Sequence, residues 1–553
     1  MFTSNGKQHV LFLIFTLSVL LTSAVCLDNV EAVPVSIQAE QRADLIVVPH
    51  QAPAMLGGAV SSRGDVNGDG LSDLVIGAQI AEGWYGAVYV YFGRRFKEAL
   101  SGGPLRVDTA SPDVAILGSG GSAGADVSSN GDVNGDGLDD IVIGAPTFFP
   151  APPNSSGRVY IVFGRKEWPK TIELENGGAD VIIGEPKAGG WLGSFLDTEG
   201  DVNGDGMNDI LIAGEDVWMP TGSPPIMGEG YLILGRRQFP PVMNVGTDAD
   251  VIFNAWAGQV NGTFGFLREV KSGGDINGDG YSDMIFYFPQ KYGSPFPNYK
   301  SGYFVVFGSP SLPGYINLLS SADVRIEITA GDFSAGVEID GDINGDGFDD
   351  ILLRGSREIS YPPGSGPVPS LDSDVHLFWG RRDFPQIIDV EVTPGDVVIS
   401  RSISGNPGFG ESIATADLNG DGKDEFVISS GYWAAPACSN CSPPTVEQPP
   451  GRVFLFKGSD RLPAQMTDRE AFLEIVGTRN DGFGDGRGRA LDLGGDFNGD
   501  RLPDLSIGAY VTGIWEGVGT PYPFEFAAGR AYLFDGGMLR RALGPEPQIL
   551  PKE

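Results

Sequence analysis

DVNGDGLSD, at residues 65–73, is a nine-residue phrase that recurs through the chain. Its seven related copies are 67 to 79 residues apart and begin at Asp65, Asp132, Asp201, Asp275, Asp342, Asp417 and Asp496. Self-similarity at a nearly constant period is the signature of a repeat architecture. The sequence therefore predicts seven structural units of the same kind.

Strand-like segments surround every copy. A buried, β-branched run follows each phrase, as at residues 74–78 and 141–145, and a second run comes after a further loop, as at 88–91 and 159–162. One strand before the phrase and one further along complete a set of four. A repeat of four strands at this period is typical of a propeller blade. We therefore predict an all-β, seven-bladed β-propeller with four-stranded antiparallel blades.

The two ends of the chain indicate how the ring closes. Outer strands open with Asp-Val at residues 113, 180, 250, 323 and 396, whereas only two more strands follow the seventh phrase. Residues 44–48 have the same Asp-then-apolar pattern and precede the first phrase. We expect this N-terminal strand to complete the seventh blade, because that pairing removes a free sheet edge. A linear solenoid is the alternative, and it would leave two exposed edges.

Composition supports the same fold class. The 553 residues include 82 glycines and 40 prolines, which favour turns and disfavour helix interiors. There are 37 basic against 72 acidic residues, a net charge of −35. Because phosphate binding needs clustered Lys and Arg, we expect no nucleic-acid partner. A carboxylate excess of this size is solvated, kept apart or neutralised by cations.

The repeated phrase has the chemistry of a calcium loop. Oxygen-bearing side chains stand at positions 1, 3, 5 and 9, with a backbone carbonyl at position 7, and calcium takes six to eight oxygen ligands. Glycines at positions 4 and 6 allow the tight turn. An EF-hand is excluded for the first copy, because its twelfth residue is Ile76 rather than a glutamate. A single copy could be a solvated turn, but seven copies in register favour calcium.

The candidate calcium ligands are the first, third, fifth, seventh and ninth residues of each copy. They are Asp65, Asn67, Asp69, Leu71, Asp73, Asp132, Asn134, Asp136, Leu138, Asp140, Asp201, Asn203, Asp205, Met207, Asp209, Asp275, Asn277, Asp279, Tyr281, Asp283, Asp342, Asn344, Asp346, Phe348, Asp350, Asp417, Asn419, Asp421, Lys423, Glu425, Asp496, Asn498, Asp500, Leu502 and Asp504. Glu425 replaces an aspartate in the sixth loop. Arg501 replaces a glycine in the seventh, where we expect backbone strain and weaker binding.

The first residues predict a secretory signal. Lys7 precedes an apolar run at residues 10–21 and small residues at 22–24, a run too short for a comfortable membrane span. We expect residues 1–26 to be a signal peptide cleaved between 24 and 32, residues 27–42 a short N-terminal segment, 43–538 the propeller and 539–553 a C-terminal tail. The mature protein is then secreted, extracellular or at the cell surface, or periplasmic in a bacterium, without a transmembrane span.

Secretion would allow disulfide formation at two cysteines and glycosylation at three asparagines. Cys438 and Cys441 lie in a Pro-rich loop, and in an oxidising compartment we expect a local disulfide rather than a zinc half-site or a redox motif. Asn154, Asn261 and Asn440 open N-glycosylation sequons.

The repeats resemble the FG-GAP family, the seven-bladed propeller of integrin alpha subunits. The calcium-type loops, the Phe-Gly pairs at residues 264, 409 and 483, and Gly-Ala-Pro at 144–146 carry the resemblance over roughly residues 43–538. The resemblance implies a propeller, but its motifs say less about function.

The loops between the second and third strands form the expected ligand face. Turns in an antiparallel blade alternate between its two ends, so these long loops lie opposite the calcium loops. They carry aromatic residues suited to an interface, namely Trp84, Tyr85, Phe148, Phe149, Trp218, Tyr292, Tyr361, Trp433 and Trp515. Aromatics that instead cap the blades are the alternative.

The sequence predicts a binding protein rather than an enzyme. A catalytic triad would need His50 or His376, which lie in or beside predicted strands. We therefore expect a calcium-binding, non-enzymatic adhesion or ligand-binding propeller that recognises an extracellular protein or glycan. The alternative is a propeller-type polysaccharide lyase or hydrolase that acts on extracellular glycans.

Overall fold

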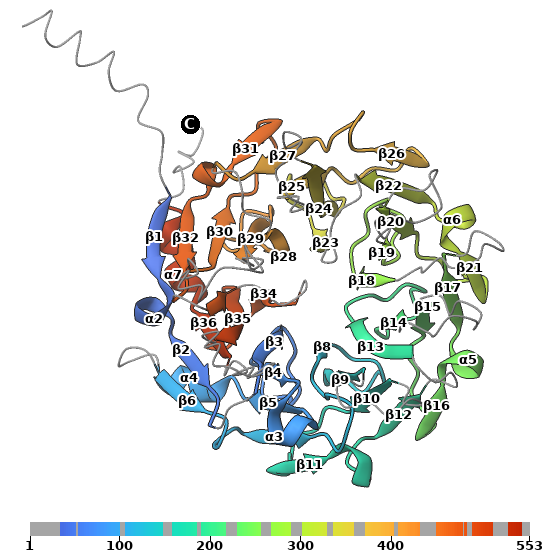
Figure 1. The fold of residues 1–553 in the computed structure, drawn as a ribbon, viewed down its shortest axis with the longest axis vertical. Coiled ribbons are helices and arrows are strands. Elements are labelled where there is room, and N and C mark those ends of the chain that lie inside the picture. Colours follow the sequence, from blue (N-terminus) through green and yellow to red (C-terminus); the bar gives the residue numbers. More distant parts are fainter. Residues whose placement is uncertain are drawn as a thin grey trace, which may run out of the picture.

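The fold is known from a computed structural model, and its described residues are 34–50, 54–99, 105–146, 157–184, 190–216, 229–255, 267–288, 301–328, 336–358, 371–402, 408–431, 450–478, 481–483, 489–512 and 529–544. Seven β-sheets stand around a common axis as the blades of a ring (Figure 1). The predicted all-β, seven-bladed propeller is confirmed.

Each blade begins with two strands joined by one of the repeated phrases. The innermost strands are β3 (Leu56–Ser61), β8 (Asp126–Gly131), β13 (Gly190–Asp197), β18 (Arg268–Ser272), β23 (Val337–Gly341), β28 (Gly408–Ala416) and β34 (Leu491–Gly495). The second strands are β4 (Leu74–Ala78), β9 (Asp140–Ala145), β14 (Ile210–Asp216), β19 (Met284–Phe288), β24 (Asp350–Glu358), β29 (Glu425–Gly431) and β35 (Asp504–Thr512). In the seventh blade, β33 (Asp481–Phe483) also pairs with β35.

Two further antiparallel strands lie toward the rim. The third strands are β5 (Ala87–Tyr91), β10 (Arg158–Val162), β15 (Glu229–Ile233), β20 (Ser301–Val306), β25 (Leu371–Phe378), β30 (Arg452–Phe456) and β36 (Arg530–Phe534). The fourth are β7 (Val114–Leu117), β12 (Val181–Gly184), β17 (Val251–Asn254), β22 (Val324–Ile328), β27 (Val397–Ser400), β32 (Leu473–Val476) and β2 (Leu45–Val48).

A fifth strand on every blade corrects the four-strand prediction. It pairs in parallel with the fourth strand and comes from the segment that precedes the fourth strand of the next blade. These strands are β11 (Thr171–Glu173), β16 (Val242–Asn244), β21 (Tyr315–Asn317), β26 (Ile387–Asp389), β31 (Gln465–Thr467), β1 (Val35–Gln38) and β6 (Leu105–Asp108). Most have only three residues, too few for a recognisable sequence pattern. They cover backbone groups that an edge strand would otherwise expose.

The N-terminal strands join the two ends of the chain. β2 pairs antiparallel with β36 in the seventh blade, and β1 pairs in parallel with β32 in the sixth. Figure 1 shows the blue β1 and β2 beside the orange and red strands of the C-terminal blades. The predicted domain boundary at residue 43 leaves β1 outside the propeller, whereas the sheet includes it.

Short helices connect the strands. They are α2 (Ala39–Arg42), α3 (Ala81–Trp84), α4 (Arg94–Ala99), η1 (Leu174–Asn176), α5 (Val245–Asp248), α6 (Leu318–Ser321), η2 (Asp468–Glu470) and α7 (Gly536–Ala542). Leu539 of α7 is fully buried, so the propeller continues past the predicted boundary at residue 538. None of the helices in the described part of the chain is long and apolar enough to cross a membrane.

The hydrophobic core is divided among the spaces between blades. One cluster, for example, combines Val75 and Val88 of the first blade with Ile141 and Ile143 of the second. Each blade therefore buries both faces against its neighbours, which explains why its strands are apolar runs without alternation. This packing leaves the loops at the two ends of the ring, and the polar residues near its axis, as candidates for function.

Candidate metal loops and axial charge cluster

All seven phrases lie at one end of the ring. Each connects the first strand of a blade to the second, as residues 62–73 connect β3 to β4. Equivalent connections in equivalent blades share one face. Seven acidic loops are therefore gathered on that face.

The first aspartate of each loop organises the turn. Asp65 Oδ1 accepts hydrogen bonds from the backbone N–H of Gly68 at 2.7 Å and of Asp69 at 3.1 Å, while Oδ2 accepts one from Gly70 at 2.8 Å. Glycines at position 4 have φ between 70° and 77°, and those at position 6 have φ between 79° and 92°. Only a residue without a Cβ adopts such angles at little cost, which is why the phrase needs both glycines.

The last carboxylate of each loop is buried. Asp73 accepts hydrogen bonds from the backbone N–H of Val66 and of Gly93, both at 3.0 Å. Gly93 follows Phe92 at the end of the third strand, so the Phe-Gly pair supplies a donor to the loop. Burial raises the pKa of Asp73 to about 8, although the Gly93 N–H lowers it, and the neighbouring carboxylates of Asp65 and Asp69 raise it further.

The same perturbation recurs around the ring. Burial raises the pKa of this last carboxyl to about 7 in Asp209 and to about 8 in Asp140, Asp283, Asp350, Glu425 and Asp504. Each loop thus concentrates carboxylates that repel one another without a counter-charge.

The donor set fits a hard cation. Asn277 and Asn419, at position 3 of their loops, are 7% and 6% exposed, and the Oδ1 of each is buried without a hydrogen-bond partner. An acceptor of this kind costs free energy unless a donor or a cation reaches it. Carboxylate and amide oxygens are the ligands that calcium prefers. The loop side chains at positions 1, 3, 5 and 9 would hold such an ion.

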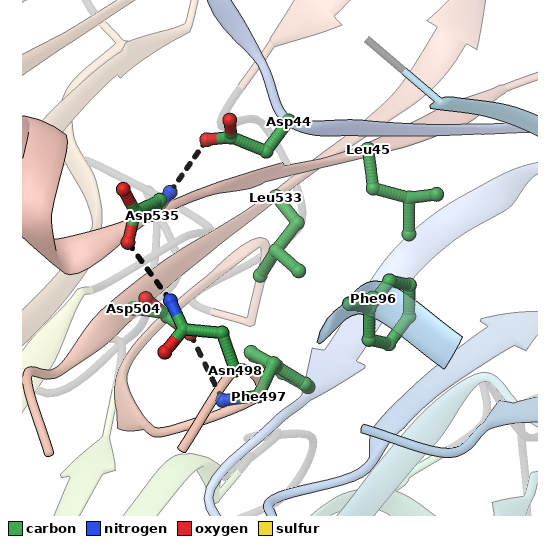
Figure 2. A pocket seen from close by; sticks show the side chains of 8 residues that line it. All are labelled: Asp44, Leu45, Phe96, Phe497, Asn498, Asp504, Leu533 and Asp535. Carbon is green, nitrogen blue, oxygen red and sulfur yellow. Dashed lines mark hydrogen bonds between the residues drawn. The ribbon is translucent and has the colours of Figure 1, made fainter. Parts of the chain in front are cut away.

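The seventh loop departs from the other six. Arg501 has a φ of 68°, in the left-handed region, as expected from its replacement of a glycine. Asn498 donates through Nδ2 to Asp535 at 2.9 Å (Figure 2). In the first loop, Asn67 donates instead to Asp73 at 3.0 Å. The cavity lined by Asn498, Asp535 and their neighbours measures about 10 Å³, room for roughly one water molecule, so it is no ligand pocket.

Position 8 of the phrase links neighbouring blades, a role that the sequence analysis missed. Asp139 Oδ2 accepts the backbone N–H of Asp65 at 2.7 Å, and Ser72 Oγ accepts that of Asp496 at 3.0 Å across the closure. The same contact is made in other blades by Asn208, Ser282, Asp349 and Asp424. The sequence signal for this contact between blades was a small polar residue at position 8, just before the last carboxylate.

The Asp-Val signature of the fourth strands is structural. Asp180 accepts the backbone N–H of Phe163 at 2.9 Å and pairs with Arg165, which lies over the ring of Trp168. Arg236 with Asp250, and Arg381 with Asp396, repeat the pair. Each pair fastens the end of the third strand to the start of the fourth.

A second group of charges meets across the axis. We call Arg63, Asp197, Glu199, Lys271, Glu338, Asp340 and Asp492 the axial cluster. Arg63 of the first blade donates to Asp340 of the fifth and, through Nε at 3.0 Å, to Asp492 of the seventh. Lys271 Nζ lies 3.2 Å from Glu338 Oε2 and 3.9 Å from both Asp197 and Glu199. Blades that are not neighbours come into contact here.

The axial cluster is strongly coupled electrostatically. Burial raises the pKa of Glu199 to about 7, opposed by Lys271 and Arg63. Burial also raises the pKa of Asp340, but Arg63 and Lys271 outweigh it and hold that pKa below its usual range. These residues stand two or four positions before a phrase, at the ends of the inner strands or just beyond them. Their charge was visible in the sequence, but their meeting across the ring was not.

The predicted ligand face is only partly described. Trp84 ends α3, and Tyr85, in the connection between β4 and β5, is 52% exposed opposite the metal loops. The other predicted contacts lie outside the described residues, as do the cysteines and sequons: Phe148, Phe149, Trp218, Tyr292, Tyr361, Trp433, Trp515, Cys438, Cys441, Asn154, Asn261 and Asn440.

Comparison with known proteins agrees with the repeat class. Residues 57–91, 124–162 and 409–453 match the FG-GAP repeat. Integrin alpha-5 of Xenopus laevis is 29% identical over 158 residues, which cover 28% of this chain and 13% of the relative. Integrin alpha pat-2 of Caenorhabditis elegans is 32% identical over 165 residues, covering 28% and 13%. With the seven blades, these matches support an FG-GAP, integrin-alpha-like propeller.

Other similarities extend beyond integrins. Phosphatidylinositol-glycan-specific phospholipase D of Bos taurus is 28% identical over 231 residues, covering 38% of this chain and 24% of the relative. The solved alpha-L-arabinofuranosidase of Lactobacillus brevis has a TM-score of 0.30 at 10% identity, covering 62% of this chain and 89% of that one. A similarity that weak carries no argument about activity. The alignments span only about an eighth to a quarter of these curated relatives.

Proposed function

We propose that this protein is a calcium-binding, non-enzymatic propeller, secreted or at the cell surface, that binds a protein or a glycan through the face opposite its calcium loops. The observation that carries the proposal is the gathering of seven acidic loops on one face, with buried oxygens that lack a donor in Asn277 and Asn419. Calcium supplies the positive charge that such loops need. The opposite face is then left for a partner.

The similarity to integrin alpha subunits supports a ligand-binding propeller. The phospholipase D relative is named as specific for phosphatidylinositol-glycan, so we keep glycans among the proposed ligand classes. Tyr85 supports the choice of face, because an aromatic side chain that is half exposed on a connecting loop is suited to an interface. We propose that the aromatic loops of the other blades form the rest of this surface.

Calcium removal tests the metal assignment. An extracellular site of this class has a Kd of about 10⁻⁴ to 10⁻³ M, and occupancy at ten times Kd stabilises by about 1.4 kcal/mol for each loop. We expect excess chelator to lower the melting temperature and added calcium to restore it. An unchanged melt, with no metal found by elemental analysis, would overturn the assignment.

A glycan array and a protein-interaction screen, both with calcium, test the ligand assignment. We expect Tyr85→Ala to weaken binding about tenfold, as at an interface hot spot. Tyr315→Ala is the matched control, because Tyr315 is 54% exposed but lies on β21 at the rim. Ultraviolet detection of unsaturated sugar products, or release of reducing ends, would favour the lyase or hydrolase instead.

A further inference from the structure

The axial cluster has more negative charge than its own cations balance. Asp197, Glu199, Glu338, Asp340 and Asp492 face only Arg63 and Lys271 among the residues of this cluster. The side chains of Glu199 and Glu338 are only 9% and 2% exposed, so water screens these charges weakly. A buried excess of carboxylate charge is relieved either by protonation or by a further cation.

One corner of the cluster has the dimensions of an ion site. Glu199, Glu338 and Asp340 each offer a carboxylate oxygen, and these oxygens lie within 4.8 Å of one another. Calcium–oxygen distances are about 2.3–2.6 Å, so two ligands on opposite sides of one ion are roughly 5 Å apart. A single ion can therefore reach all three oxygens without a large movement of the strands.

Glu199 supplies an independent indication. Its Oε1 accepts a hydrogen bond from Asn130 at 2.7 Å, whereas Oε2 is buried and has no hydrogen-bond donor. Oε2 forms ion pairs with Arg63 and Lys271 at 3.6 and 3.9 Å, but both distances are too long for a hydrogen bond. Oε2 therefore has no direct ligand and can still accept a metal ion, whose charge would add to that of the two cationic side chains.

We propose that Glu199, Glu338 and Asp340 form a site for a hard divalent cation on the propeller axis, distinct from the seven loops. The donors are all carboxylate oxygens, which suits calcium, magnesium or manganese rather than softer metals. Glu199 comes from the third blade, and Glu338 and Asp340 come from the fifth. The ion thus ties together two blades that are not neighbours, at the end of the axis nearest the loops.

Crystals of the full chain grown with Mn²⁺ test this site, because an anomalous difference map locates manganese directly. We expect an axial peak between the three carboxylates, in addition to peaks in the loops. Glu338→Gln and Glu199→Gln should each remove the axial peak and leave the loop peaks. Asp136→Asn, the matched control, should remove one loop peak and leave the axial peak.

A wild-type map without an axial peak would overturn the site, whether or not the loops hold metal. Loop peaks alone would support the proposed calcium loops and reject only the axial ion. An axial peak that persists in both glutamate variants would also reject these three ligands. In solution, elemental analysis should show about one bound ion fewer in Glu199→Gln than in the wild type.

Discussion

A single position of the third strand shows how one side chain sets a local response to pH. It is aromatic in six blades, as Tyr89, Tyr160, Tyr231, Phe304, Phe454 and Tyr532, and it is His376 in the fifth. His376 is 8% exposed, and its Nδ1 accepts the backbone N–H of Gly395 at 3.3 Å. Burial lowers its pKa to about 4, from an ordinary value of 6.5.

We predict that His376→Phe makes the protein more resistant to acid. The unfolded chain takes up a proton at His376 near pH 6.5, but the folded chain resists protonation until about pH 4. The contribution of neutral His376 to the free energy of unfolding is therefore fully present above pH 6.5. This contribution falls by an amount on the order of 3 kcal/mol as the pH drops from 6.5 to 4.

Denaturant unfolding of both proteins at several pH values, in chelator, measures this difference. The advantage of His376→Phe should grow as the pH falls below 6.5 and be small at pH 7.5. His50→Asn is the control, since the His50 side chain is 56% exposed. Parallel stability curves for wild type and His376→Phe would contradict the prediction.

Each nine-residue loop has structural contacts of its own, apart from any metal. Its first aspartate holds the turn, as Asp65 does, and its last carboxylate binds the end of the third strand, as Asp73 does. In the first six loops the eighth residue also contacts the preceding blade, as Asp139 of the second loop contacts Asp65. The turn therefore has a structural role even without metal. This explains why the seventh loop keeps the same backbone bonds to Asp496 despite Arg501.

We predict that Asp136→Ala costs more stability than Asp500→Ala only when calcium is present. Both side chains accept the same local bond at 3.0 Å, from Leu138 and Leu502 respectively. The two variants should then melt alike in chelator. In calcium, Asp136→Ala loses a well-formed site, whereas the seventh loop is already compromised by Arg501. Thermal melts in both conditions measure the effect, and the reverse order in calcium would show that the seventh loop binds well.

At the scale of the whole molecule, the N-terminal segment fastens two blades. β2 completes the seventh blade, β1 covers the sixth, and Arg530 of β36 pairs with Glu40 of α2. These contacts link residues that are more than four hundred positions apart in the sequence. The ring therefore has no free seam among its described strands.

We predict that removing residues 27–52 destabilises the entire ring or drives aggregation, because it exposes β36 and β32. A milder variant, Ile46→Ala, removes a fully buried side chain of β2 and should cost about 2–5 kcal/mol. Gln38→Ala, at an exposed position of β1, should cost less than about 0.5 kcal/mol. Size-exclusion chromatography and thermal melts check these expectations. A truncated protein that stays monomeric and melts with the full-length chain would contradict them.

The sequence by itself determined the number of blades, the strand class and the loop chemistry, because these depend on local patterns repeated seven times. It also indicated closure by residues 44–48, since their pattern matched the other outer strands. The fifth strands, the contact of Asp139 with Asp65, and the axial cluster were decided only by tertiary structure. Three-residue edge strands have no periodicity, and Arg63 and Asp340 are 277 positions apart, so only the closed ring brings them together.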